Sequence, residues 1–203
     1  MTQPDAQFIQ MCSDPQYTPV ETVGNRMYIL TNAGAPKYRL MVADVSNPGY
    51  ADWKELVGEG ESVLEDVTFT AGNRMILQYA KDNCNQLYVY DTDGNRLSEI
   101  ELPTFGTTSV SGARGQKELF YSFTSYTTPG AIYSYDMATA KSTLLSMPKL
   151  AFRTQDYVTE MLFYTSKDGT RAPLFITHKK GLKLNGKNPL LLYGYGGFNV
   201  TYK

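Results

Sequence analysis

The sequence predicts a mainly β protein, in which about three four-stranded units of a β-propeller are followed by the first strands of an α/β domain. Three observations lead to this prediction: a repeat of about 45 residues, a change of pattern near residue 150, and an apolar run that ends in glycines. Aromatic residues make up 13% of the 203 residues, and 16 residues are tyrosines. Such residues are enriched in strands. No segment shows sustained helical periodicity, so we expect little helix.

The first three quarters of the chain repeat one pattern of strands and turns. The segments 39–44, 86–91 and 131–136 each end in aspartate, at Asp44, Asp91 and Asp136. Each aspartate follows a turn glycine and a further strand-like run. We expect each of them to accept hydrogen bonds within its own turn.

Each repeat has the size of one propeller blade. In the middle repeat, Asp93-Gly94 is a hairpin signal between two alternating runs, and two more short strands flank the pair. We therefore predict units at 20–60, 61–105 and 106–148; a sandwich or a β-helix stays open as an alternative. Three units cannot close a ring, so we expect an internal piece of a longer protein that self-associates through open propeller edges.

A second pattern begins after residue 150, and the predicted domains are 1–150 and 151–203. Alternating residues at 156–165 and 172–178 flank a turn at 166–170, which predicts a hairpin. The run 189–192 predicts a buried strand of an α/β-hydrolase sheet, and glycines follow it at its carboxyl end.

Composition excludes several classes of function. A formal net charge of -1 gives no electrostatic case for nucleic acid, and no apolar run is long enough to span a bilayer. Cys12 and Cys84 are too few for a disulfide framework, and with His178 alone they do not suggest a metal site. We therefore predict reduced thiols, no metal, no nucleic acid and no membrane. The compartment, cytoplasmic or periplasmic, stays open.

Long segments of the chain resemble the prolyl oligopeptidases, in the order of that family. They are 32–40, 120–130, 156–170, 178–181 and 192–199, the last containing Tyr193-Gly194-Tyr195-Gly196-Gly197-Phe198. The resemblance implies late propeller blades followed by the start of the peptidase domain. It also implies a serine peptidase that uses a Ser-His-Asp triad, needs no cofactor and cuts short peptides after proline.

The resemblance implies two site residues in this chain. Tyr195 matches the tyrosine whose hydroxyl stabilises the oxyanion, and Phe198 matches the phenylalanine that lines the proline pocket. Tyr193 is interpreted as structural, and His178 as a non-catalytic histidine before the loop. The sequence contains no Gly-x-Ser-x-Gly motif, so we expect no triad residue here and an inactive chain. The alternative is a propeller that serves as a non-enzymatic binding module.

Overall fold

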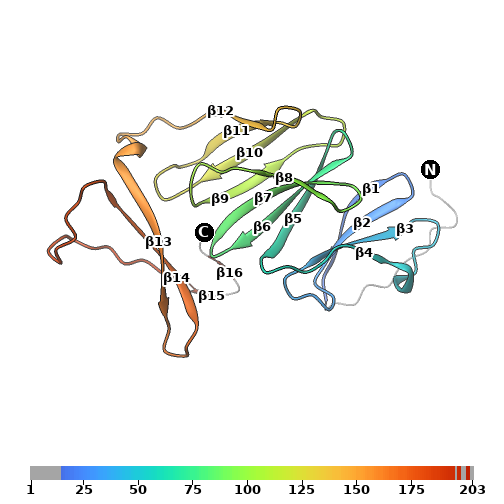
Figure 1. Cartoon of the computed structure of the whole chain (residues 1–203), viewed down its shortest axis with the longest axis horizontal. Coiled ribbons are helices and arrows are strands. Elements are labelled where there is room, and N and C mark those ends of the chain that lie inside the picture. The colour runs from blue at the N-terminus through green and yellow to red at the C-terminus, as the bar shows by residue number, and fades with distance from the viewer. Residues whose placement is uncertain (1–14, 195, 198–199, 202–203) are drawn as a thin grey trace.

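Three four-stranded antiparallel sheets follow one another along the described part of the chain (Figure 1). The computed structural model describes residues 15–194, 196–197 and 200–201. The first sheet contains β1 (Tyr17–Val23), β2 (Arg26–Thr31), β3 (Arg39–Asp44) and β4 (Lys54–Val57). The second contains β5 (Val63–Thr70), β6 (Arg74–Lys81), β7 (Cys84–Asp91) and β8 (Arg96–Ile100). The third contains β9 (Thr107–Ser111), β10 (Glu118–Thr124), β11 (Ala131–Asp136) and β12 (Lys141–Ser146).

The three predicted units are confirmed as sheets whose strands pair in sequence order. The second and third sheets fall within 61–105 and 106–148, and the first begins at Tyr17, slightly before the predicted 20–60. The low helix content is confirmed for the described residues, where the helical elements are the 3-10 turns η1 (Tyr50–Asp52) and η2 (Thr154–Asp156). None of the helices in these residues has the length and apolar character that crossing a bilayer requires.

Apolar side chains of neighbouring sheets form the cores between them. Leu40 of the first sheet belongs to one buried cluster with Phe69 and Leu77 of the second. Leu87 of the second sheet packs in the next cluster with Tyr121 of the third. Strand alternation produces this arrangement, since successive side chains in a strand point to opposite faces of the sheet. Each face then packs against a different neighbouring sheet. The second sheet is therefore covered on both faces.

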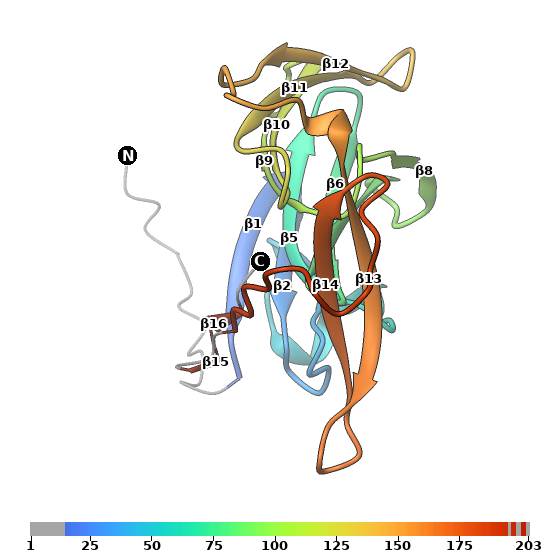
Figure 2. The same cartoon turned by 90° about the vertical axis from the view of Figure 1, so that its left-hand side faces the viewer.

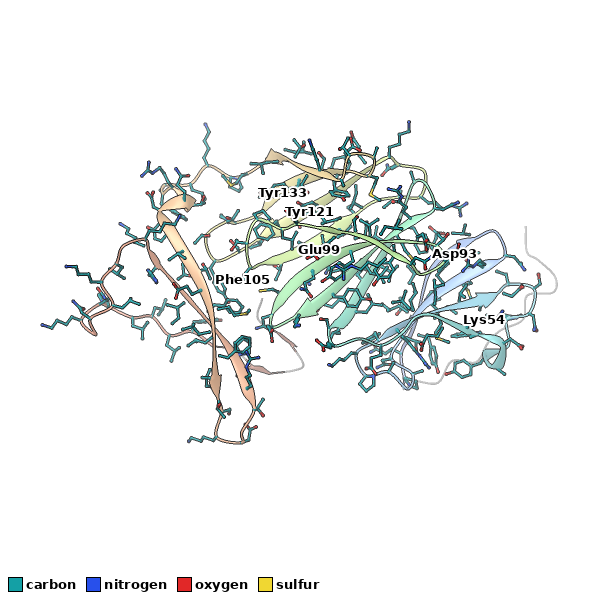
Figure 3. The ribbon with its side chains drawn as sticks, viewed as in Figure 1. Lys54, Asp93, Glu99, Phe105, Tyr121 and Tyr133 are labelled. Carbon is teal, nitrogen blue, oxygen red and sulfur yellow. The ribbon has the colours of Figure 1, made fainter. Side chains whose placement is uncertain are left out.

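Aromatic pairs reinforce the packing around these cores. Tyr28 and Phe69 meet edge to face across the first interface, with ring centroids 4.8 Å apart. Tyr121 and Tyr133 stack within the third sheet at 5.1 Å (Figure 3). The enrichment in tyrosine thus has a packing role, because these rings bury a large apolar area.

The outer face of the first sheet has a smaller core of its own. Ile29 and Met41 are buried there with Trp53, which lies just after η1. The indole N–H of Trp53 donates to the carbonyl of Pro48 at 3.0 Å, and Tyr50 packs against the indole ring at 5.1 Å. The segment after β3 therefore covers part of this face.

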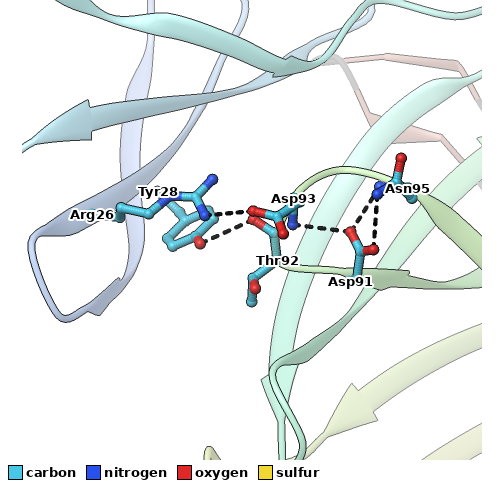
Figure 4. Close-up of polar contacts among 6 residues, drawn as sticks. All are labelled: Arg26, Tyr28, Asp91, Thr92, Asp93 and Asn95. Carbon is cyan, nitrogen blue, oxygen red and sulfur yellow. Dashed lines mark hydrogen bonds and ion pairs between the residues drawn. The ribbon is translucent and has the colours of Figure 1, made fainter.

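The repeating aspartates accept hydrogen bonds in their turns, as predicted. Asp91 accepts the backbone N–H groups of Asp93 and Asn95, both at 2.9 Å, and the side-chain amide of Asn95 (Figure 4). Asp44 accepts from Ser46 N–H at 2.8 Å and from the side-chain amide of Asn25. In the third sheet, Asp136 accepts from Ala138 N–H at 2.7 Å and Thr139 N–H at 3.2 Å. The period of the repeat therefore corresponds to an equivalent hydrogen-bonded turn in each of the three sheets.

The predicted hairpin is present as β13 (Tyr157–Thr165) and β14 (Arg171–Lys179), paired along their whole length. It lies beside the second and third sheets, at the end where the β6–β7 turn and the β8–β9 and β10–β11 loops gather (Figures 1 and 2). The opposite end of these sheets carries the β7–β8 and β11–β12 turns.

The buried strand predicted at 189–192 is wrong for this structure. These residues have no strand partner, and Leu190, Leu191 and Leu192 are 86%, 91% and 78% exposed. A strand forms only when neighbours pair with its backbone, and the described residues supply none for this run. Beyond it, β15 (Gly196–Gly197) pairs with β16 (Val200–Thr201) in a short antiparallel ladder.

Candidate functional site

The glycine loop is the predicted site, and its two key side chains, Tyr195 and Phe198, lie outside the described residues. Their roles stay predictions. Among the described residues near them, Gly196 pairs antiparallel with Thr201, and Gly197 pairs with Val200. Tyr193, interpreted as structural, is 64% exposed.

An aromatic contact joins the hairpin to the propeller-like sheets. The ring of Phe175 on β14 packs on Tyr126 of the β10–β11 loop at 5.3 Å and on Phe105 of the β8–β9 loop at 6.3 Å (Figure 3 labels Phe105). Met161 pairs directly across the hairpin from Phe175, so both side chains emerge on the same face. This face of the hairpin is the one turned toward the sheets.

A cavity of about 510 Å³ lies beside this contact. Met161 forms its hairpin wall, and the β6–β7 turn with Lys81 and Cys84 and the β8–β9 loop with Phe105 form the rest. Its lining mixes apolar side chains with single charges. It contains neither histidine nor serine, so it does not offer the Ser-His pair of a serine peptidase.

Asn85 fixes the loop that carries Phe105. Its side chain is buried, donates to Glu65 at 2.8 Å and accepts the backbone N–H of Thr108 at 2.9 Å. Its own backbone N–H donates to the carbonyl of Gly106 at 2.9 Å. A methyl group on Gly106 would stand 2.3 Å from the Thr124 carbonyl oxygen, so the loop presses closely on the third sheet.

Sequence reasoning missed this docking site, including Asn85, Phe105, Tyr126 and Phe175. Asn85 follows a turn in the sequence, where asparagine is ordinary. The available signal was the pair of loop aromatics Phe105 and Tyr126, since rings in otherwise polar loops need a partner.

His178, which was predicted to be non-catalytic, lies near the end of β14, and its role stays a prediction. Its Nδ1 lies 2.8 Å from the carbonyl oxygen of the neighbouring Lys179, a local contact near the end of β14. Throughout the described ranges, no group of three or more His, Cys, Asp or Glu side chains is placed to hold a metal ion. Cys84 forms no disulfide within the described part of the chain, and Cys12 lies outside the described residues.

The pKa shifts of titratable groups in the turns and strands favour structural roles for these groups. Hydrogen bonds from the side chain and backbone of Asn95 hold the pKa of Asp91 below its usual range, and backbone N–H groups do the same for Asp136. Burial raises the pKa of Tyr79 and of Tyr121, so both phenols remain neutral at physiological pH.

Comparison with known proteins identifies the family. The family model for the N-terminal β-propeller domain of prolyl oligopeptidase matches residues 1–148. The chain belongs to the prolyl oligopeptidase family. It is 40% identical over 189 residues to a prolyl endopeptidase of Elizabethkingia meningoseptica, an alignment that covers 93% of this chain and 26% of that relative. A prolyl endopeptidase of Elizabethkingia miricola is 39% identical over 183 residues, with 90% and 26% covered.

Solved prolyl oligopeptidase structures have the same fold over most of this chain. A structure from a study of two prolyl endopeptidases superposes with a TM-score of 0.82 at 38% identity, covering 92% of this chain and 28% of that one. Prolyl oligopeptidase B of Galerina marginata, bound to a 35mer hydrolysis and macrocyclization substrate, gives a TM-score of 0.80 at 27% identity, with 91% and 26% covered. The chain thus spans about a quarter of the length of the prolyl oligopeptidases that it matches.

Proposed function

We propose that this chain is a section of a proline-specific serine endopeptidase, with late propeller blades in 1–150 and the start of the peptidase domain in 151–203. The observation that carries the proposal is the extent of the alignment. It covers 189 residues of a prolyl endopeptidase, whereas the propeller match covers residues 1–148. The similarity must therefore include residues after the propeller match, where the hairpin and the glycine loop lie.

In the longer polypeptide, Tyr195 would donate a hydrogen bond to the oxyanion. Attack on the scissile carbonyl places negative charge on its oxygen, and a fixed neutral donor lowers the energy of that state. A phenol is neutral at pH 7 and its rigid ring holds the donor in place. The glycines around it let the backbone approach the substrate closely.

Phe198 would line the pocket for the substrate proline. An apolar ring selects a compact apolar residue by shape and takes no part in proton transfer. The substrates would be short peptides that contain proline, since the propeller would restrict access to the site.

The exposed apolar run would become a strand of the peptidase sheet. Leu190, Leu191 and Leu192 present a large apolar surface to solvent, which is costly unless another part of the protein covers it. Flanking strands would pair with the backbone of this run and bury these side chains. The predicted strand would then form in the longer polypeptide.

The chain alone would be inactive, because the sequence lacks the Gly-x-Ser-x-Gly motif and its single histidine, His178, bonds to a neighbouring carbonyl. We expect the purified chain to release no product from a chromogenic peptide with proline before the scissile bond. Turnover that copurifies with the chain through repeated chromatography would contradict this part of the proposal.

The role of Tyr195 is tested in the longer polypeptide. Tyr195→Phe removes only the hydroxyl, so we expect kcat to fall by about 10²–10³-fold with little change in KM. Tyr193→Phe is the matched control, because it removes a hydroxyl two residues away and should retain activity. Equal activities of the two variants would exclude Tyr195 as the oxyanion donor.

A further inference from the structure

Three pairs in the sequence place an aspartate or asparagine directly before a glycine: 93–94, 168–169 and 185–186. Such a pair can rearrange, because glycine has no side chain to hinder its backbone nitrogen from attacking the preceding side-chain carbonyl. The reaction requires an unengaged glycine N–H, an electrophilic carbonyl and open space around the nitrogen. The three pairs differ in these features.

The turns protect both aspartate pairs. The N–H groups of Gly94 and Gly169 donate to carbonyl oxygens three residues earlier, at 3.3 and 3.0 Å. The backbone N–H of Thr170 holds the pKa of Asp168 below its usual range. That side chain is therefore an ionised carboxylate, which is a poor electrophile.

The third pair, Asn185-Gly186, lies in the exposed loop between β14 and the run 189–192. Within the described ranges, no hydrogen bond engages the N–H of Gly186. Gly186 has a φ of +75°, and a β-carbon placed on it would have nothing within 4 Å. The backbone nitrogen of this glycine is therefore accessible.

The side-chain carbonyl of Asn185 is held in place and polarised. Its Oδ1 accepts the backbone N–H of Lys187 at 3.0 Å. Because this hydrogen bond spans Gly186, it keeps the amide carbon close to the glycine nitrogen. A donor at this oxygen also stabilises the negative charge that develops there during attack. The positive charges of Lys183 and Lys187 on either side favour the deprotonated, nucleophilic form of the Gly186 amide.

We propose that Asn185 is a site of spontaneous deamidation in the folded protein. The Gly186 nitrogen forms a bond to Cγ of Asn185, the Cγ–Nδ2 bond breaks, and the side-chain nitrogen leaves as ammonia with the proton from the Gly186 amide. Water then opens the cyclic imide at one of its two carbonyls, which gives aspartate or isoaspartate. This inference does not depend on the proposed function.

Both products change the loop ahead of the run 189–192. Each places a carboxylate near Lys183 and Lys187, where the unmodified chain has a neutral amide. Isoaspartate also adds a methylene group to the main chain. The modification therefore alters both the charge and the backbone length of the loop.

Peptide mapping by mass spectrometry tests the proposal on the 203-residue chain, kept folded under mildly alkaline conditions. We expect the segment with Asn185 to acquire the mass of the acid, with aspartate and isoaspartate forms that separate in chromatography. Asn188 is the control within the same exposed loop, because Pro189 has no backbone N–H that could attack it. Equal conversion at both asparagines, or none at Asn185, would overturn the proposal.

A synthetic peptide of residues 180–190 separates the effect of the loop structure from that of the sequence. The peptide has the same Asn185-Gly186 pair, but no fold holds the Lys187 contact in place. We expect Asn185 to convert at least as fast in the folded chain as in the peptide. Slower conversion in the folded chain would show that the fold protects the pair, and would overturn the proposal.

Two glycine variants test the attacking nitrogen. Gly186→Ala should slow conversion by about tenfold or more, equivalent to about 1.4 kcal/mol in the barrier, because a methyl group shields the nitrogen. Gly181→Ala is the matched control, since Gly181 has a φ of +76° in the same loop and equally open surroundings but follows Lys180. It should leave the conversion of Asn185 unchanged. Equal rates in the two variants would exclude attack by the Gly186 nitrogen.

Discussion

At the scale of single residues, buried polar groups decide how the sheets are joined. Asn85 is buried, and its side chain connects Glu65 of the second sheet with the backbone of Thr108 in the third. Charged and amide groups in such positions stabilise the fold, because without them a buried hydrogen-bonding group would have no partner.

We predict that Asn85→Leu lowers the free energy of unfolding by about 2–3 kcal/mol, because Thr108 N–H loses its acceptor in a buried site. For a chain of this size, that is a decrease of about 5–10 °C in melting temperature. Thermal unfolding followed by circular dichroism measures it. The control is Asn188→Leu, since Asn188 is exposed and its side-chain amide donates to the Lys183 carbonyl. Similar decreases for both variants would contradict the role of Asn85.

The turn aspartates predict how stability depends on pH. Hydrogen bonds hold the pKa of Asp91, Asp136 and Asp168 below the ordinary value. The folded state therefore binds these protons less tightly than the unfolded state, and its stability is complete above the unfolded-state pKa of about 3.9. Stability should fall as pH decreases below that value toward the folded-state pKa.

Asp91→Asn tests this dependence, because its amide oxygen still accepts the turn N–H groups but does not titrate in this range. We expect the melting temperature of the variant to fall less than that of wild type between pH 5 and about pH 3. Glu101→Gln serves as the exposed control. An acid limb identical in Asp91→Asn and wild type would show that this turn contributes nothing to acid sensitivity.

At the scale of elements, most strands could be predicted because their information is local. Alternation and turn residues around Asp44, Asp91 and Asp136 identify each unit, and the structure has sheets there. The run 189–192 could not be predicted in the same way, since the described residues supply no strand that pairs with it. Its composition specifies burial, but only paired neighbours make it a strand.

The docking site could not be predicted from sequence for a related reason. Phe105, Tyr126 and Phe175 come from three segments, and no pattern within any one of them specifies the others. The catalytic prediction for Tyr195 and Phe198 depended on resemblance to a family, because glycines and tyrosines alone are compatible with an ordinary strand end.

Phe175→Ala should release the hairpin from the sheets. An isolated hairpin is marginally stable, and two aromatic pairs are worth about 0.5–1.5 kcal/mol each. We expect amide hydrogen exchange in 157–179 to accelerate roughly 5- to 100-fold, with the three sheets unchanged. The control Tyr164→Ala removes a ring that is 52% exposed on the opposite face of the hairpin. Unchanged exchange in Phe175→Ala would show that another contact holds the hairpin.

At the scale of the whole molecule, the row of sheets has an open outer strand. Every residue of β12 is exposed, including Leu144 at 48% and Leu145 at 54%. An unpaired strand edge with exposed apolar groups tends to pair with another chain.

We therefore predict that the 203-residue chain self-associates through β12, with a mass that rises with concentration in sedimentation velocity. Leu145→Lys should shift the equilibrium toward monomer by about tenfold or more, because lysine discourages edge pairing. Leu97→Lys is the control, since Leu97 is 51% exposed on β8 of the second sheet. A single monomeric species at all concentrations would contradict the prediction.

Arg26 of the first sheet donates to Asp93 of the second, and Arg74 of the second sheet donates to the Met137 carbonyl of the third. These contacts between sheets can therefore form only in chain order during biosynthesis. Arg26 and its partner Asp93 are 67 residues apart, and Arg74 and Met137 are 63 residues apart. A ribosome that adds about 5–20 residues per second takes roughly 3–13 s to make the second partner after the first. During that interval the newest sheet has emerged with one apolar face uncovered. The most recently made sheet therefore has one face without a partner, and the next sheet covers that face when it folds.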